Sequence, residues 1–309
     1  MTSDELPEGW SFRATTGEDA DVLLALVHAS DMSAVGFADF APEDVAEALA
    51  GPYSEVAVDA TGAIAGWTWV DNGSDGPRDF VEVYVHPEGG RPAMRPLLAR
   101  VLAVTERRAR ERGGEGTVRA GAIPAELPWI ASLTDQGFTF VKQYARMQLD
   151  LPAPAVEPVP DVVVRAAGED DMPEFFRVLD TAFRDTPDYQ PTGYERWRER
   201  FLDGHRVRLD EWFVAEVDGV VAGILQSSEQ SDVQGEGWVK HLAVLPEFRK
   251  RGVGRALLAA AFARYLANGR VSAGLGVDLT NPTEAIKLYT GVGMRPAYQA
   301  NIYERPALR

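Results

Sequence analysis

A basic segment with two glycines is the part of the chain best suited to hold an anion. Glycines spaced two apart let the backbone approach an anion closely, and a following helix directs its N-terminal amides and positive dipole end to the same place. A solvated basic run is the alternative, which the glycines disfavour. The segment reads Arg249-Lys250-Arg251-Gly252-Val253-Gly254-Arg255, with four cationic side chains in seven residues of a chain of net charge −16.

A second segment places a phenol on what the sequence predicts to be a helix. Asn281 is an N-cap candidate, Pro282 suits the first helical position, and Glu284 completes a capping-box pattern. Spacing by four puts Asn281, Ala285 and Tyr289 on one face. Tyr289 could be a core aromatic, but beside an anion loop we interpret it as a functional residue.

These segments require an α/β scaffold, and the chain contains two copies of one. Residues 151–160 include four prolines and predict an extended linker between domains 1–150 and 161–309. Four short sequences recur in the same order on either side, such as Ala-Gly at 65–66 and 222–223 between apolar runs. We interpret this as a duplicated α/β unit.

The copies differ at the glycine loop. At the corresponding place the N-terminal copy has residues 88–96, which are one residue shorter and include two prolines, so amides that could bind phosphate are missing. We therefore expect the first domain to be degenerate and to pack on the second, catalytic domain.

The composition excludes several classes of function. Apolar residues make up 45% and charged residues 25%, as in a globular protein, and neither a membrane-spanning run nor a signal peptide is evident, so we expect a cytoplasmic protein. There are no cysteines, and the four histidines lack metal-ligand spacing, so no metal is expected. The strongly negative charge argues against nucleic acid as a partner.

The order of these motifs resembles the GCN5-related N-acetyltransferase (GNAT) superfamily, including tandem members such as mycothiol synthase. It comprises a strand, Val-x-Pro, Arg-x-x-Gly-x-Gly, a long helix, another strand and Asn-x-x-Ala-x-x-x-Tyr. The resemblance covers 162–305 with these motifs and 10–150 without them. It implies two tandem domains, each a mixed, mostly antiparallel twisted sheet flanked by helices, with acetyl-CoA as donor.

The resemblance also assigns roles to residues. The strand Leu242-Ala243-Val244 would pair with the pantetheine arm, and Arg249 to Arg255 would hold the pyrophosphate. Asn281 would contact pantetheine, and Tyr289 would stand near the thioester sulfur. The amide of Val244 could stabilise the charge that develops on the carbonyl oxygen.

Two further parts of the site are less well defined. One is the base that deprotonates the amine, and the other is the set of residues that binds the acceptor. The family often has a glutamate at the position of Trp238; Glu236, two residues earlier on the same strand face, is the first candidate and His241 the second. Each could equally be an ordinary turn or strand residue. For the acceptor, the segment that frames it suggests Asp185, Tyr189 and Trp197, unless these are only a polar loop and a core tryptophan.

We therefore predict an N-acetyltransferase that transfers acetyl from acetyl-CoA to a primary amine of a small molecule or peptide, by direct attack in the second domain. Two alternatives remain open. One is a non-catalytic acyl-CoA-binding module with a regulatory role. The other is an enzyme like mycothiol synthase that acetylates a cysteinyl sugar conjugate.

Overall fold

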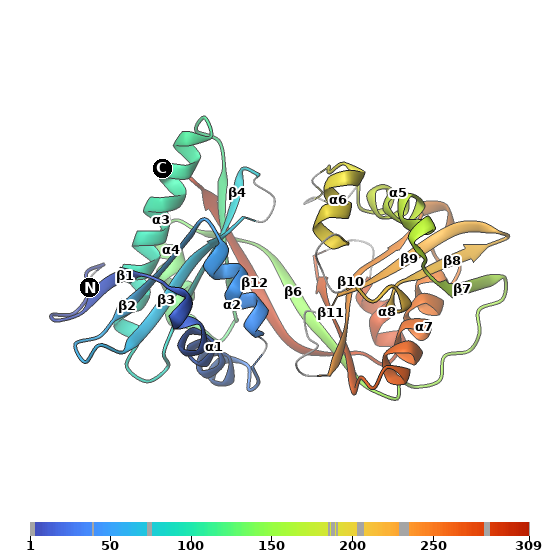
Figure 1. Cartoon of the computed structure of the whole chain (residues 1–309), viewed down its shortest axis with the longest axis horizontal. Helices are drawn as coiled ribbons and strands as arrows, with labels where there is room; N and C mark the ends of the chain where they lie inside the picture. Colours follow the sequence, from blue (N-terminus) through green and yellow to red (C-terminus); the bar gives the residue numbers. More distant parts are fainter. Residues whose placement is uncertain are drawn as a thin grey trace. The chain divides into compact units, whose positions relative to one another are not determined.

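The chain folds into two compact units, which are described separately (Figure 1). One unit is Met1–Tyr144 with Tyr298–Arg309, and the other is Ala145–Ala297. The computed structural model describes residues 4–38, 40–72, 76–184, 186, 189, 191–202, 207–228, 235–280 and 285–308.

The first unit has a mixed sheet covered by helices on both faces. Its strands follow the order β1-β2-β3-β4-β5-β12, and they are antiparallel except for the pair β4 and β5. Helices α1 and α2 pack on the face that carries Trp67 and Trp69, and α3 packs on the face of Val70 and Val81. The elements are β1 Ser11–Ala14, α1 Ala20–Ala34, α2 Pro42–Ala50, β2 Tyr53–Val58, β3 Ile64–Asp71, β4 Arg78–Val85, α3 Met94–Glu111, β5 Thr117–Ala122, α4 Leu127–Asp135 and β12 Arg295–Pro306.

The second unit repeats this arrangement. Its strands follow the order β6-β11-β10-β9-β8-β7, with a parallel pair at β10 and β11. One core cluster lies under α5 and α6, and the other lies under α7 and α8. The elements are β6 Thr139–Asp150, β7 Val162–Ala166, α5 Met172–Phe183, α6 Tyr194–Phe201, β8 Phe213–Val217, β9 Val220–Ser228, β10 Glu236–Val244, α7 Val253–Ala267, β11 Ser272–Asp278 and α8 Ala285–Gly291.

Both units thus have the predicted mixed, mostly antiparallel sheet flanked by helices. The duplication extends to register, because Gly66 lies opposite Val85 in the first unit as Gly223 lies opposite Val244 in the second. The duplicated sequences therefore correspond to duplicated structure.

The boundaries of the units differ from the expected domain ranges 1–150 and 161–309. They fall within two long strands, β6 after Tyr144 and β12 after Ala297, rather than in the proline-rich segment. The reason is strand pairing: β12 pairs with β5 from Asn301 opposite Ala122 to Pro306 opposite Thr117, so the end of the chain completes the sheet of the first unit.

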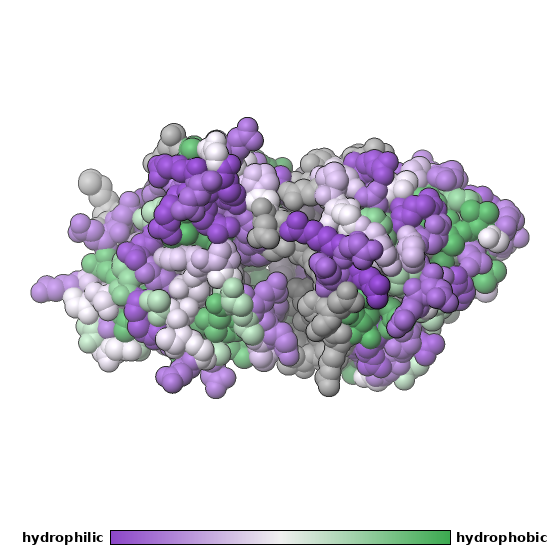
Figure 2. All heavy atoms as spheres, turned by 45° about the horizontal axis from the view of Figure 1, so that its top comes forward, coloured by the Kyte–Doolittle hydropathy of each residue, from purple (hydrophilic) through white to green (hydrophobic). Residues whose placement is uncertain are grey.

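Surface hydropathy and helix composition describe how polar the outside of the chain is. One side carries mostly hydrophilic residues with smaller hydrophobic patches (Figure 2). Among the described residues, no helix combines the length and apolar character needed to cross a membrane.

Candidate active site

A side chain at either glycine of the loop would crowd a neighbouring side chain, and Gly252 also has a backbone conformation that favours glycine. Gly252 has φ +83° in the left-handed region and is the N-cap of α7. A Cβ there would lie 2.7 Å from Val159 Cγ1, and a Cβ on Gly254 would lie 2.9 Å from Leu288 Cδ2. No side chain in the described part of the chain caps the helix, so its first amides are left for another acceptor.

The positive charge around this helix start is directed outward. All four cationic side chains of the loop are exposed. Arg249 Nε lies 3.3 Å from the carbonyl oxygen of Val244, and its Nη2 lies 3.2 Å from that of Ala182, which ties the loop to β10 and α5. Nη2 of Arg251 lies 3.8 Å from Oδ2 of Asp218. Exposed cations beside uncapped amides form a site suited to a pyrophosphate.

Strand β10 diverges from β11 just before the loop. Their parallel pairing runs from Glu236 opposite Ser272 to Val239 opposite Leu275, and β10 continues to Val244 without β11 beside it. On its other side β10 remains paired, with the amide of Leu245 donating to the Ala222 oxygen at 3.0 Å. Successive peptide groups along a strand point to opposite sides. The amides of Val244 and Leu242 therefore point into the divergence, whereas that of Ala243 points to β9.

Tyr289 lies on α8 beside this region. Leu288, its neighbour, contacts the position of Gly254, which brings α8 against the start of α7. The side chain of Tyr289 is only 9% exposed, and burial raises its pKa to about 12. Within the described part of the chain its hydroxyl has no hydrogen-bond partner. Asn281, the expected cap of this helix, lies outside the described residues.

Glu236 is a buried ion-paired residue. It is 1% exposed, and its Oε2 lies 2.7 Å from Nη2 of Arg146, whose guanidinium stacks on Trp238 at 4.7 Å. It stands eight residues before Val244, roughly 25 Å away along an extended strand. The predicted role of Glu236 as base is therefore not supported by its placement.

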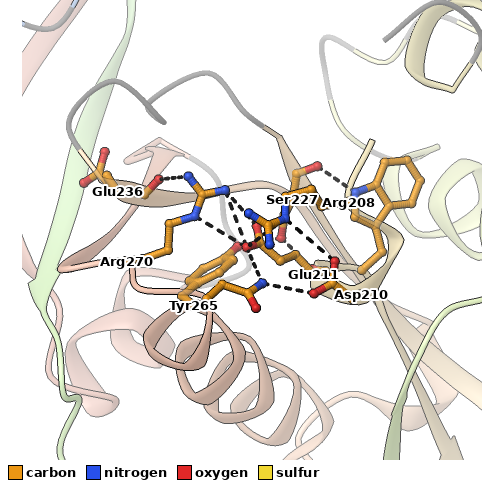
Figure 3. Close-up of polar contacts among 9 residues, drawn as sticks. Arg208, Asp210, Glu211, Ser227, Glu236, Tyr265 and Arg270 are labelled. Carbon is orange, nitrogen blue, oxygen red and sulfur yellow. Dashed lines mark hydrogen bonds and ion pairs between the residues drawn. The ribbon is translucent and has the colours of Figure 1, made fainter. Parts of the chain in front are cut away.

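A second buried ion pair holds the same end of the sheet (Figure 3). Arg270 pairs with Glu211 at 3.2 Å and also donates to the backbone oxygen of Glu236 at 3.3 Å. Ser227 Oγ lies 2.6 Å from the hydroxyl of Tyr265 on α7. These contacts join β9 to α7, and they join the segment after α7 to β10 and to Glu211 before β8, and their burial assigns them to the framework of the unit.

His241 occupies the position nearer the divergence. A bulge between Val239 and His241 places it opposite Gln226, on the face covered by α5 and α6. Its Nδ1 lies 2.8 Å from Gln226 Oε1, and its half-buried ring meets the rings of Phe183 and Phe201 edge-on, each at 5.8 Å. With the Gln226 oxygen accepting from Nδ1–H, the lone pair lies on Nε2.

Of the three predicted acceptor residues, the structure describes Trp197 and Tyr189. Trp197 is 2% exposed and packs among aromatic side chains, including Phe175 at 6.2 Å. Tyr189 donates a hydrogen bond to Asp180 of α5. Asp185 lies outside the described residues. Trp197 is thus a core residue under α5 and α6, and acceptor binding by Tyr189 and Asp185 stays a prediction.

Three neighbours of the site were not found from the sequence. Arg146 lies on β6, Val159 lies in the proline-rich segment, and Gln226 lies on β9. Each touches a predicted residue through a contact distant in sequence, which no local pattern signals. Among the described residues there is also no group of three or more His, Asp or Glu side chains placed to hold a metal ion.

Two sequence comparisons match part of the chain, and the first lies within the second unit. The profile of the acetyltransferase (GNAT) family matches residues 172–294. An uncharacterized N-acetyltransferase from Archaeoglobus fulgidus is 32% identical over 122 residues, which are 38% of this chain and 83% of that relative.

Two solved structures share the fold of both units. A GCN5-related N-acetyltransferase from Sphaerobacter thermophilus has a TM-score of 0.84 at 22% identity and covers 99% of this chain and 98% of its own. A tandem GNAT protein from the clavulanic acid biosynthesis pathway has a TM-score of 0.70 at 16% identity, with coverage of 97% and 99%. The predicted tandem fold is confirmed, and the chain belongs to the acetyltransferase (GNAT) family.

Proposed function

We propose that the second unit transfers the acetyl group of acetyl-CoA to a primary amine of a small molecule or a peptide. The observation that carries the proposal is the meeting of three features at one end of this unit. Amides of β10 face the divergence from β11, and the start of α7 lies at the glycine loop. The phenol of Tyr289 lies on α8. Among the described residues no side chain caps α7 and no group hydrogen-bonds this phenol.

Each feature has a part in the reaction. The loop amides and the exposed cations from Arg249 to Arg255 would bind the pyrophosphate, and the β10 backbone would pair with the pantetheine arm. The amine nitrogen attacks the thioester carbonyl carbon, forming the C–N bond while negative charge grows on the oxygen. The Val244 amide would stabilise that charge. The C–S bond then breaks, and the thiolate leaves.

Tyr289 is suited to the thiolate as a donor. Because its pKa is about 12, the phenol is protonated at neutral pH. A free thiol has a pKa near 8.5, so full proton transfer would be unfavourable if only the phenol felt the burial. Burial also raises the pKa of a thiol in the same place, so the pKa values of the phenol and the thiol lie closer together. Tyr289 would therefore hydrogen-bond the leaving sulfur and pass its proton as the charge develops.

His241 replaces Glu236 as our candidate base. A base must lie within hydrogen-bond reach of the amine or of a bridging water. His241 lies on β10 three residues before Val244, whereas Glu236 is buried against Arg146. A neutral imidazole can accept, through water, the proton that the amine nitrogen gives up as it attacks the thioester.

The test is release of free CoA from acetyl-CoA in the presence of a panel of primary amines. The proposal predicts amine-dependent release and an acetylated amine detectable by mass spectrometry. Binding of acetyl-CoA without release by any amine would favour the non-catalytic alternative and overturn the proposal. Selective acetylation of a cysteinyl sugar conjugate would instead favour the mycothiol-synthase-like alternative.

A further inference from the structure

Arg249 joins the glycine loop to the C-terminal end of α5. Its Nη2 donates to the carbonyl oxygen of Ala182 at 3.2 Å, and its Nε donates to that of Val244 at 3.3 Å. Ala182 lies in the last turn of α5, and Val244 is the last residue of β10. One side chain of the loop therefore connects a helix and a strand that are far apart in the sequence.

The end of α5 uses this arginine as a cap. The last carbonyl groups of an α-helix have no partner within the helix. In α5 the oxygen of Phe183 accepts from the amide of Thr186 at 2.9 Å, and the oxygen of Ala182 accepts from Arg249. A guanidinium suits this place because the C-terminal end of a helix carries partial negative charge. The cap thus comes from the glycine loop and not from α5 itself.

The corresponding helix of the first unit ends in another way. Helix α1 is closed by its own backbone, since Gly36 has φ +86° and its amide donates to the oxygen of Asp31 at 3.2 Å. Counted from the prolines Pro87 and Pro246, the position that matches Arg249 is Gly90. The arginine is therefore found in the copy that has the glycine motif, and the other copy has a glycine in its place.

The residue after Ala182 contacts the proposed base. The ring of Phe183 meets that of His241 edge-on, with centroids 5.8 Å apart, and Gln226 contacts Nδ1 of the same imidazole at 2.8 Å. Phe248, which precedes Arg249, packs with Ala182 and Phe183 on the core cluster under α5 and α6. A shift of the last turn of α5 would therefore reach His241 through Phe183.

We propose that Arg249 is a positioning residue that fixes the end of α5 and, through Phe183, the imidazole of His241. Its Nε and Nη2 are used on backbone carbonyls, so the other three exposed cations of the loop would supply the charge for the pyrophosphate. This role differs from the contact with the cofactor that the sequence resemblance assigns to Arg249. The inference rests on the proposed acetyl transfer, because it takes His241 as the base.

Arg249→Met tests the proposal, because methionine keeps much of the length of the side chain without its donors. Arg249 is exposed, so the variant should fold. The last turn of α5 should open more often, and hydrogen exchange of the amides at 180–183 should be about ten-fold faster. With the base less well placed, kcat/KM for the amine should fall roughly ten-fold. The affinity for acetyl-CoA, measured by calorimetry, should change by less than about two-fold.

Two further variants make the result specific. Arg249→Lys keeps the charge and can reach one of the two carbonyls, so it should recover part of both effects. Arg255→Met removes another exposed cation of the same loop and should leave hydrogen exchange in α5 unchanged. Weaker acetyl-CoA binding by Arg249→Met, with unchanged exchange in α5, would overturn the proposal and return Arg249 to the pyrophosphate.

Failure of this inference can be told from failure of the proposed function. If the parent protein acetylates amines and Arg249→Met matches it in kcat/KM and in α5 exchange, only the role of Arg249 is wrong. If the parent protein itself releases no CoA with any amine, the proposed function is wrong, and the role of Arg249 at the base is wrong with it. The parent protein is therefore assayed first.

Discussion

Tyr289 is the residue whose replacement most directly tests the reaction. Tyr289→Phe removes the hydroxyl and keeps the ring in its packed place on α8. With the phenol in its proposed role at the departing thiolate, kcat should fall roughly 100-fold, while the KM for acetyl-CoA should change little. Tyr303→Phe is a matched control, since Tyr303 is also 9% exposed but lies on β12. Equal turnover in the two variants would remove the role assigned to Tyr289.

Substitutions in the Arg146–Glu236 ion pair test whether Glu236 has a structural role or acts as the base. Arg146→Met leaves a buried carboxylate without its partner and should lower the free energy of unfolding by about 3 to 5 kcal/mol. Adding Glu236→Gln removes that lone charge and should restore much of the loss in urea unfolding. If Glu236 is structural, the double variant keeps the pH profile of kcat/KM that the parent shows; loss of its basic limb would return Glu236 to the role of base.

At the scale of elements, the start of α7 was predictable and its surroundings were not. The glycines and cations of the loop follow an apolar run and precede a helical pattern, so the sequence indicates strand, loop and helix. Tyr289 was found in the same way, from spacing. The buried partner of Glu236 could not be found from the sequence, because Arg146 lies 90 positions away along the chain and only the sheet order brings it near. The local sequence pattern thus locates the elements, whereas strand pairing between distant segments determines which residues each side chain contacts.

The loop itself gives the prediction at this scale. Gly252→Ala puts a Cβ at φ +83° and 2.7 Å from Val159, so the loop must shift. Amides moved away from the pyrophosphate should weaken acetyl-CoA binding about ten-fold or more, measured by calorimetry. Gly17→Ala, where a Cβ meets nothing within 4 Å, is the control and should leave affinity unchanged. Unaltered affinity in Gly252→Ala would mean that the loop does not hold the pyrophosphate.

At the scale of the whole molecule, the repeated sequences predict two units but not how the strands are shared. Self-similarity shows that the copies exist and in what order their elements come. It does not show which sheet receives a strand at the end of the chain, because pairing between distant segments leaves no local pattern. For that reason the first unit includes Tyr298–Arg309 although a proline-rich segment at 151–160 suggests a simple division.

This sharing of strands makes a prediction about fragments. A fragment of residues 1–150 has the expected first domain but lacks β12, which pairs with β5 over Asn301 to Pro306. It also loses the ion pair of Arg119 with Glu304, at 2.7 Å, and the buried side chain of Tyr303. An exposed β5 edge should leave the fragment aggregation-prone or unfolded. Hydrogen exchange should show the β5 amides protected in the full chain and unprotected in the fragment. A soluble fragment with protected β5 amides would mean that the first unit folds without β12.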